Sequence, residues 1–334
     1  MKKISILGTG SWGTALAQVL TDNQHDVLLY GISKSQVNDI NLNHLNTEFF
    51  DSTPLNKTIK ATLSLEEALN DADYLLITIP TNQVRVELTK INKLLNHKIV
   101  IINASKGFDL EKKKRISETI REVIDPKFRH EIVSLIGPSH AEEVVVRMLT
   151  TVSAVSYDLE IANQVQKLFS NDYFRVYAQD DEIGAEYGVA LKNVIALAAG
   201  ALAGLGYGDN TKAALITRGL AEMVRYGLKK GGEFNTYLGL TGIGDLVVTC
   251  SSKHSRNFQA GYQIGQVDSA KEFMEANKKT VEGIRTCKVI YEDIKDDDTI
   301  EMPITKAIYQ VLYLGAKPSE VIQLLMLREL KIEQ

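Results

Sequence analysis

The sequence predicts an α/β domain with a mostly parallel sheet, followed by an all-α domain. Through the first half, short apolar runs alternate with amphipathic stretches, which is typical of parallel strands joined by crossover helices. From about residue 180 the β-branched alternation largely disappears and helical spacing replaces it. The length of 334 residues exceeds one usual domain of roughly 150 residues. We therefore expect one domain over residues 1–180 and a second over residues 181–334.

Seven short apolar runs in the first half are expected to be strands. They are Lys3–Leu7, Asp26–Tyr30, Tyr74–Ile79, Ile99–Asn103, Ile132–Leu135, Val152–Ser156 and Arg175–Tyr177. Helical patterns lie between several of them, at Thr14–Asp22, Leu65–Leu69 and Lys112–Val123. The charged run Glu111–Arg115 is interpreted as the solvated start of the third helix rather than as a functional basic patch.

The second half is expected to be helical at Ile183–Leu205, Thr211–Lys230 and Thr305–Leu314. Ala and Gly are dense in Ala196–Gly206, which indicates helices packed closely against each other. The most apolar stretch, Gly188–Gly206, is short and interrupted by polar residues, so we expect it to be buried and expect no integral membrane segment. Apolar helices here either cover a homodimer interface or lie in the interior.

Composition narrows the class of protein. The chain has 44% hydrophobic and 24% charged residues, an ordinary globular balance, and its net charge of -4 argues against a nucleic-acid-binding surface. Two cysteines give no disulfide framework, and the apolar run after the first residues is too short for a signal peptide, so a cytoplasmic location is expected. The six histidines have no paired ligand spacing, which predicts no metal site.

A glycine-rich turn follows the first expected strand and opens the first expected helix, with glycines at Gly8, Gly10 and Gly13. In this context Gly8 permits a tight turn, Gly10 lets the backbone approach a pyrophosphate, and Gly13 allows close helix–strand packing. The helix N-terminus adds unpaired N–H groups and a positive dipole. The first domain is therefore expected to be Rossmann-like and to bind a dinucleotide. A purely structural turn is the less favoured alternative.

The end of the second strand bears on which dinucleotide is bound. NAD-specific sites usually place an acidic residue here for the ribose 2′-hydroxyl, but Tyr30 is followed by Gly31, Ile32, Ser33 and Lys34. Without a carboxylate, nothing repels a 2′-phosphate, which Ser33 and Lys34 are placed to contact. This favours NADPH, with NADH possible. Lys34 is alternatively a surface residue at a helix start.

Ligands of parallel sheets bind beyond the carboxyl ends of the strands, where residues 80–82, 104–107 and 136–142 lie. Lys106 is suited to binding an anionic substrate as a point charge, or is an ordinary exposed loop lysine. Ser139 and Glu142 have the spacing of a capping box, so they start a helix, a role compatible with anion binding.

Lys192 is the strongest catalytic candidate of the second half, because it is the only charge between Gly188 and Gly206, inside an otherwise apolar helix. Burial lowers the pKa of a lysine toward a range useful for proton transfer, whereas a snorkelling surface lysine is the alternative. Asp245 is either a helix N-cap or faces the same cavity, with Thr249 one turn later. Further on, a hydroxyl, a guanidinium and an amide suited to a phosphate come together in Ser255, Arg256 and Asn257.

Taken in order, these motifs resemble those of the soluble, bacterial-type NAD(P)-dependent glycerol-3-phosphate dehydrogenases over nearly the whole chain. The segments that carry the resemblance are 8–16, 105–107, 137–142, 190–193, 206–210, 217–220, 242–246, 255–257 and 281–283. The resemblance implies reversible reduction of dihydroxyacetone phosphate to sn-glycerol 3-phosphate, which supplies the backbone for phospholipid synthesis. Many relatives carry a His-Arg type pair where this chain has Ile32 and Ser33, which weakens an inherited NADPH preference.

The resemblance also implies roles for individual residues. Lys192 would be the catalytic proton donor and acceptor, oriented by Asp245, with Lys106 as a further catalytic residue. The residues implied to contact the substrate are Lys106, Gly137, Ser139, Lys192, Asp245, Ser255, Arg256 and Asn257. Those implied to contact the cofactor are Ser11, Trp12, Lys106, Ala141, Arg256, Val281 and Glu282.

Two other functions share parts of this pattern. A β-hydroxy acid type dehydrogenase has the same layout of domains, so the Ser255–Asn257 cluster and a requirement for substrate phosphate separate the two. A non-catalytic NADPH sensor would need no lysine at position 192 in an apolar helix.

Overall fold

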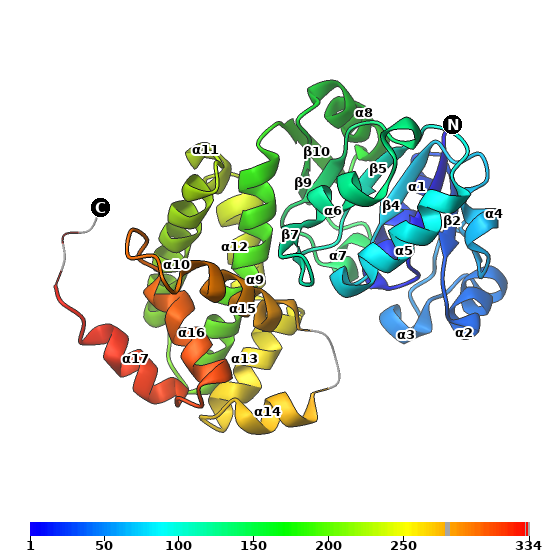
Figure 1. The fold of residues 1–334 in the computed structure, drawn as a ribbon. Helices are drawn as coiled ribbons and strands as arrows, with labels where there is room; N and C mark the ends of the chain where they lie inside the picture. The colour runs from blue at the N-terminus through cyan, green and yellow to red at the C-terminus, as the bar shows by residue number, and fades with distance from the viewer. Residues whose placement is uncertain (278–280, 331, 333–334) are drawn as a thin grey trace. The chain divides into compact units, whose positions relative to one another are not determined.

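The computed structural model describes residues 1–277, 281–330 and 332, and the chain divides into two compact units, Met1–Glu186 and Tyr187–Gln334 (Figure 1). The first unit contains the strands and the second is built from helices, so the predicted fold class is confirmed. One helix, α9 (Glu182–Gly204), begins in the first unit and continues into the second.

The first unit is built on an eight-stranded sheet with the order β10-β9-β8-β5-β4-β1-β2-β3. Every neighbouring pair is parallel except β8 and β9. The strands are β1 (Lys3–Leu7), β2 (Asp26–Tyr30), β3 (Lys60–Thr62), β4 (Tyr74–Ile77), β5 (Val100–Asn103), β8 (Val133–Ile136), β9 (Thr150–Val155) and β10 (Phe174–Gln179).

The register aligns the ends of the central strands. Leu7 of β1 pairs with Tyr30 of β2 and with Ile77 of β4, which in turn pairs with Asn103 of β5. The loops that follow these strands therefore leave the sheet at one edge, where ligands of parallel sheets bind.

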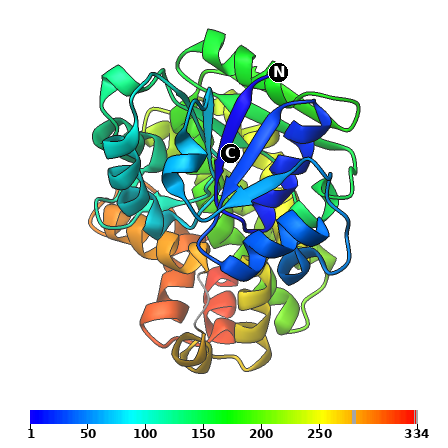
Figure 2. The same cartoon turned by 90° about the vertical axis from the view of Figure 1, so that its right-hand side faces the viewer.

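Helices lie on both sides of the sheet (Figure 2). Leu16 and Phe169 pack into an apolar cluster on one face, and Val84 and Ile120 pack into a second cluster. The helices of this unit are α1 (Ser11–Asp22), α2 (Lys34–Asn38), η1 (Asp39–Asn43), α3 (Thr47–Phe50), α4 (Leu65–Leu69), α5 (Thr81–Leu94), α6 (Ile116–Val123), η2 (Pro126–Phe128), α7 (Ala141–Val144) and α8 (Leu159–Phe169).

The second unit has no strand among residues 187–277, 281–330 and 332. Besides α9 it contains α10 (Asp209–Lys229), α11 (Phe234–Tyr237), η3 (Leu240–Gly244), α12 (Asp245–Ser251), α13 (Arg256–Gln266), α14 (Lys271–Ala276), α15 (Glu282–Ile294), α16 (Pro303–Tyr313) and α17 (Pro318–Met326). The helices α9 and α13 approach backbone to backbone, since a Cβ on Gly200 would lie 2.0 Å from the Phe258 carbonyl oxygen. The close packing expected from the Ala- and Gly-rich stretch is confirmed.

All seven predicted strands are present, with ends that differ by at most two residues. The strand β3 and the two-stranded hairpin of β6 (Phe108–Asp109) and β7 (Lys114–Arg115) were not predicted. Each is only two or three residues long, too short to show an alternating pattern.

The interpretation of Glu111–Arg115 as the solvated start of a helix is wrong. The helix α6 begins only at Ile116, and Arg115 is 7% exposed. Its guanidinium donates to Glu182 at 2.9 Å and to Glu186 at 3.3 Å. These two carboxylates compensate the buried charge, and they lie too far along the chain for a local charge pattern to reveal them.

The helix α9 is, within the part of the chain that the structure describes, the one helix long and apolar enough to cross a membrane by length and composition. Of its most apolar window, 72% is buried inside the structure. This burial is what the sequence predicted for the stretch, and it is the behaviour of a core helix.

Candidate active site

The glycine-rich loop of the first unit has the geometry of a dinucleotide cradle. Gly8 has a φ of 118°, which favours glycine, and a Cβ on Gly13 would lie 2.2 Å from the Gly8 carbonyl oxygen. Gly10, in contrast, faces open space, with no atom within 4 Å of its Cβ position. Ser11 and Trp12 then begin α1. The loop therefore leaves room for a pyrophosphate against its backbone and the start of a helix, and the residues present fit the group.

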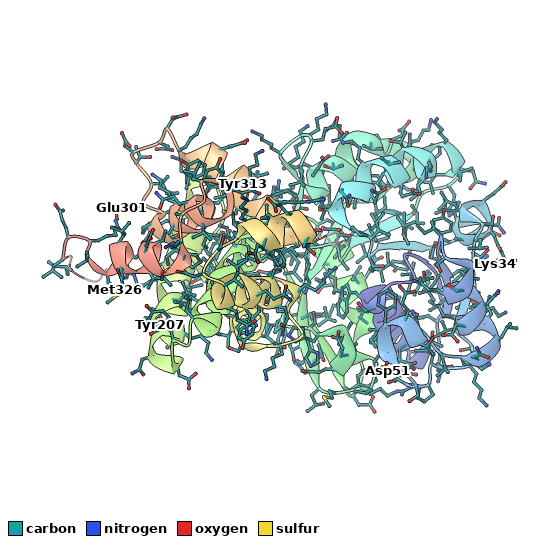
Figure 3. The ribbon with its side chains drawn as sticks, turned by 90° about the horizontal axis from the view of Figure 1, so that it is seen from below. Lys34, Asp51, Tyr207, Glu301, Tyr313 and Met326 are labelled. Carbon is teal, nitrogen blue, oxygen red and sulfur yellow. The ribbon has the colours of Figure 1, made fainter. Side chains whose placement is uncertain are left out.

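The end of β2 places Ser33 and Lys34 at the start of α2. Ser33 is the N-cap, accepting from the Gln36 backbone N–H at 3.4 Å, and its hydroxyl lies 2.8 Å from that of Ser35. Lys34 is exposed and makes no ion pair with the described residues (Figure 3). The hydroxyl and the ammonium group are thus available at the place where the sequence predicts a contact with the 2′-phosphate.

The loops after β4 and β5 are fastened together, because the Ser105 hydroxyl donates to the Ile79 carbonyl at 2.6 Å. This fixes the neighbouring Lys106, whose Nζ lies 5.7 Å from the centre of the Trp12 ring. Lys106 is half-buried and makes no ion pair with the described residues. The structure thus places Lys106 beside Trp12 of the glycine-rich segment.

The loop after β8 differs from the prediction in one respect. The Ser139 hydroxyl donates to the Gly137 carbonyl at 3.0 Å, and the N-cap of α7 is His140, with Ala141 as the first helical residue. The capping box of Ser139 and Glu142 is therefore wrong, because Ser139 precedes the cap and its hydroxyl turns back to the loop. Gly137 and Ser139 remain adjacent at the carboxyl edge of the sheet.

In the second unit, Lys192 of α9 forms a buried ion pair with Asp245 of α12. The two residues are 2% and 1% exposed, so Lys192 is not a snorkelling surface lysine. Asp245 is not an N-cap either, because Gly244 occupies that position. Its Oδ2 is buried and has no hydrogen-bond partner among the described residues. The pair thus combines a buried cation with a carboxylate that has one oxygen left for a ligand.

Two further residues of α12 border this pair. The Thr249 hydroxyl donates to the Asp245 carbonyl at 2.6 Å and so bonds the helix itself. Burial raises the pKa of the Cys250 thiol to about 12. The thiol therefore stays protonated, which excludes Cys250 as a nucleophile at neutral pH.

The Ser255–Asn257 cluster forms the start of α13. The Ser255 hydroxyl caps the helix by accepting from the Phe258 N–H at 3.2 Å, and Arg256 is exposed as the first helical residue. An arginine at the N-terminus of an eleven-residue helix suits an oxyanion, since the helix dipole adds to its charge.

Asn257 connects this cluster to the lysine. Its amide donates to Asn193 Oδ1 at 2.9 Å, and its own oxygen accepts from the Gly283 N–H at 2.8 Å. The residue beside Lys192 is thus tied to the residue beside Arg256. Sequence reasoning missed Asn193 as a site residue, although an amide within an apolar helix was a usable signal.

Val281 and Glu282 stand at the start of α15, next to the same contact. Val281 is its N-cap and is buried, and Glu282 is its first residue. Within the described residues, no group of three or more His, Cys, Asp and Glu side chains is arranged to hold a metal ion.

Hydride transfer to a carbonyl needs a dinucleotide site and a group that exchanges a proton with the substrate oxygen. The first unit contains the glycine-rich cradle, and the second contains the buried Lys192–Asp245 pair and the exposed guanidinium of Arg256. These features define the class as a two-domain NAD(P)-dependent dehydrogenase.

The comparisons with known proteins identify the family. Residues 3–162 match the N-terminal part, and residues 181–323 the C-terminal part, of NAD-dependent glycerol-3-phosphate dehydrogenases. A glycerol-3-phosphate dehydrogenase of Streptococcus pyogenes serotype M6 is 49% identical over 332 residues, covering 99% of this chain and 98% of its own. The crystal structure of the Coxiella burnetii glycerol-3-phosphate dehydrogenase is 32% identical, with a TM-score of 0.90 and coverage of 98% and 99%. The chain belongs to the NAD(P)-dependent glycerol-3-phosphate dehydrogenase family and is an oxidoreductase.

Proposed function

We propose that this protein reduces dihydroxyacetone phosphate to sn-glycerol 3-phosphate, reversibly, with NADPH or NADH. The observation that carries the proposal is the buried Lys192–Asp245 pair, tied through Asn193 and Asn257 to the exposed Arg256. A proton-exchanging lysine and a phosphate-binding arginine are the two groups that this substrate requires. Membership of the family supports the same reaction.

The protein's own residues account for the polar steps. When bound, the nicotinamide supplies the hydride to the substrate carbonyl carbon. The Lys192 ammonium polarises the carbonyl oxygen and donates a proton to the alkoxide that forms, and in the reverse direction neutral Lys192 removes it. Asp245 keeps the lysine oriented and charged. The residues proposed to hold the substrate phosphate and hydroxyl groups are Lys106, Gly137, Ser139, Ser255, Arg256 and Asn257.

The proposal includes a preference for NADPH. The preference is supported by the lack of an acidic residue directly after β2, and by the Ser33 hydroxyl and the exposed Lys34 at the start of α2. Since Ile32 and Ser33 replace the His-Arg type pair of many relatives, the preference over NADH is expected to be modest.

The reaction is tested by following the absorbance of NADPH and NADH in parallel. Purified protein is mixed with dihydroxyacetone phosphate or with unphosphorylated dihydroxyacetone. Rapid oxidation with the phosphate ester alone supports the proposal. No oxidation by folded protein would favour a β-hydroxy acid type dehydrogenase, or a sensor if NADPH still binds.

We also propose that the protein works in the cytoplasm, supplying glycerol phosphate for phospholipid synthesis, and as a homodimer. The second unit contains an apolar groove of about 420 Å³ between α9, α10, α13, α16 and α17. Apolar side chains of the last segment lie uncovered at its edge, with Met326 80% and Leu330 100% exposed (Figure 3). A continuous apolar surface of this kind is typical of a protein–protein interface.

The charges at the groove favour a second copy of the chain as its occupant. Its lining includes both signs, with Arg218, Arg225 and Arg328 beside Glu301 and Glu329. In an isologous dimer the same patch of each copy meets the other. A patch that carries both positive and negative side chains can therefore pair arginines of one copy with carboxylates of the other. An anionic lipid would meet the carboxylates of Glu301 and Glu329 as well as the arginines.

A further inference from the structure

Thr9, which lies between Gly8 and Gly10 of the glycine-rich loop, is held in place by a side chain distant in the sequence. The Asn46 amide donates to the Thr9 carbonyl at 2.9 Å and to the Thr14 hydroxyl at 2.9 Å. Asn46 is 1% exposed and is the N-cap residue of α3, yet its side chain makes no capping bond to that helix. The Asn46 side-chain amide therefore donates to Thr9 and Thr14 instead of bonding to its own helix.

A second side chain holds Thr9 through its hydroxyl. The Thr9 hydroxyl donates to Gln36 Oε1 at 2.6 Å, and the Gln36 amide donates to Glu48 at 2.6 Å. This chain of bonds joins α2 and α3 side by side (Figure 1). Gly31 closes the same space, because a Cβ on it would lie 2.5 Å from the Thr9 hydroxyl oxygen.

Holding Thr9 matters because glycines flank it on both sides. Glycine has the greatest backbone freedom of any residue, so the free loop samples many conformations besides the one that receives a pyrophosphate. The binding free energy of the dinucleotide is then reduced by the free energy needed to order the loop, unless the rest of the protein already holds the loop in that conformation. The bonds from Asn46 and Gln36 fix the carbonyl and the hydroxyl of the one residue between Gly8 and Gly10.

We propose that Asn46 and Gln36 are positioning residues for the cofactor, which set the affinity for the dinucleotide by ordering the glycine-rich loop before binding. The inference rests on the dinucleotide site of the proposed function and assigns neither residue a contact with the substrate. It predicts weaker cofactor binding, at unchanged turnover with saturating cofactor, when either bond to Thr9 is removed.

The chain contains a single tryptophan, Trp12, which lies between Gly10 and Gly13 of the glycine-rich segment, so its fluorescence should report cofactor binding without any substrate. Titration with NADPH should give a Kd raised about tenfold in Asn46→Ala, since a buried carbonyl loses its donor. Asn46→Asp keeps the shape but cannot donate, so it should weaken binding at least as much. Gln36→Leu, at a half-buried position, should raise the Kd about threefold.

Asn41 offers a matched control from the neighbouring η1. Its amide donates to the Ala61 carbonyl at 2.8 Å and its oxygen accepts from the Ala61 N–H at 2.9 Å, so it also makes two bonds but none to the loop. Because Asn41 is exposed, Asn41→Ala should lower the Tm by less than Asn46→Ala, and it should leave the Kd unchanged.

Steady-state kinetics separate positioning from general damage. In Asn46→Ala and Gln36→Leu the KM for NADPH should rise with the Kd, while kcat and the KM for dihydroxyacetone phosphate stay near the wild-type values. An unchanged Kd in both variants, or equal losses in Asn41→Ala, would overturn the proposal. If Asn46→Ala does not fold, Gln36→Leu and Thr9→Val still test the proposal, because each removes the bond between the Thr9 hydroxyl and Gln36. Cofactor binding by a protein that does not reduce dihydroxyacetone phosphate would contradict the proposed reaction alone.

Discussion

At the scale of single residues, the proposed chemistry depends on a charge that the fold buries. An unpaired ammonium group in an apolar interior is strongly disfavoured, and Lys192 is retained there because Asp245 compensates its charge. One oxygen of Asp245 has no partner among the described residues, so a ligand hydroxyl can complete the pair.

Replacing the lysine tests this role directly. Lys192→Ala should lower kcat by ~100-fold or more, because the alkoxide would then form without a positioned proton donor. The measurement is the steady-state rate at saturating NADPH and dihydroxyacetone phosphate. Lys212, paired with Asp209 on the surface of the same unit, gives the matched control, and Lys212→Ala should leave kcat unchanged. Near-normal turnover in Lys192→Ala would remove the lysine from the mechanism.

Arg256 has a different expected signature. Arg256→Ala should raise the KM for dihydroxyacetone phosphate by ~10-fold or more, because a charge-assisted bond to the phosphate is lost. The same variant should react with unphosphorylated dihydroxyacetone as slowly as the wild type does, since that compound has no phosphate to bind. An unchanged KM for the phosphate ester would contradict the phosphate-binding role.

At the scale of elements, a buried carboxyl group holds the start of α16. Glu222 of α10 accepts from the backbone N–H groups of Ile304 and Thr305 at 2.5 Å and 3.0 Å, and from the Thr305 hydroxyl at 2.8 Å. Burial raises the pKa of Glu222 from 4.5 to about 7 and outweighs these hydrogen bonds, which lower it. The contact that joins α10 to α16 is therefore sensitive to pH.

The raised pKa gives a prediction with a definite sign. The folded state binds the Glu222 proton more tightly than the unfolded state, so this group's stabilising contribution is complete below about pH 4.5 and is lost as the pH rises through 7. The shift from 4.5 to about 7 corresponds to about 3 kcal/mol. In Glu222→Gln the free energy of unfolding should fall less between pH 5 and pH 8 than in the wild type, as urea titrations would measure. The exposed Glu272→Gln serves as control, and identical slopes in all three proteins would refute the prediction.

Features could be predicted from the sequence where the interacting residues are close together along the chain, and could not where the partners are far apart. Strands β1, β2 and β4 and helix α1 were predictable because their patterns are local, and so was the glycine-rich turn. The role of Arg115 was not, since Glu182 and Glu186 lie more than sixty residues further on. Asn46 gave no local signal either, because its partners Thr9 and Thr14 belong to another motif. Lys192 was predictable because a charge in an apolar helix breaks the local pattern.

At the scale of the whole molecule, the helix α9 contributes residues to both units. Its first turns carry Glu182 and Glu186, which bond Arg115 of the first unit, and its later turns carry Lys192. The Ser117 hydroxyl also lies within hydrogen-bond distance of both carboxylates, at 2.8 Å from Glu182 and 2.6 Å from Glu186. The first turns of the helix that carries Lys192 are thus bonded to Arg115 and Ser117 within the first unit.

The proposed homodimer gives the last prediction, because the apolar groove and the final segment belong to one surface. Removing residues 327–334 deletes Leu327 and Leu330, which are 81% and 100% exposed, together with Arg328 and Glu329 of the groove lining. If these side chains cover the groove of a second copy, the shortened protein should sediment as a monomer at concentrations where the full chain sediments as a dimer. Removing only residues 331–334 keeps Leu330 and should leave the dimer intact. A full chain that is monomeric at every concentration, or a dimer indifferent to the longer deletion, would exclude this surface, and a lipid found by mass spectrometry in the monomer would identify the groove's occupant instead.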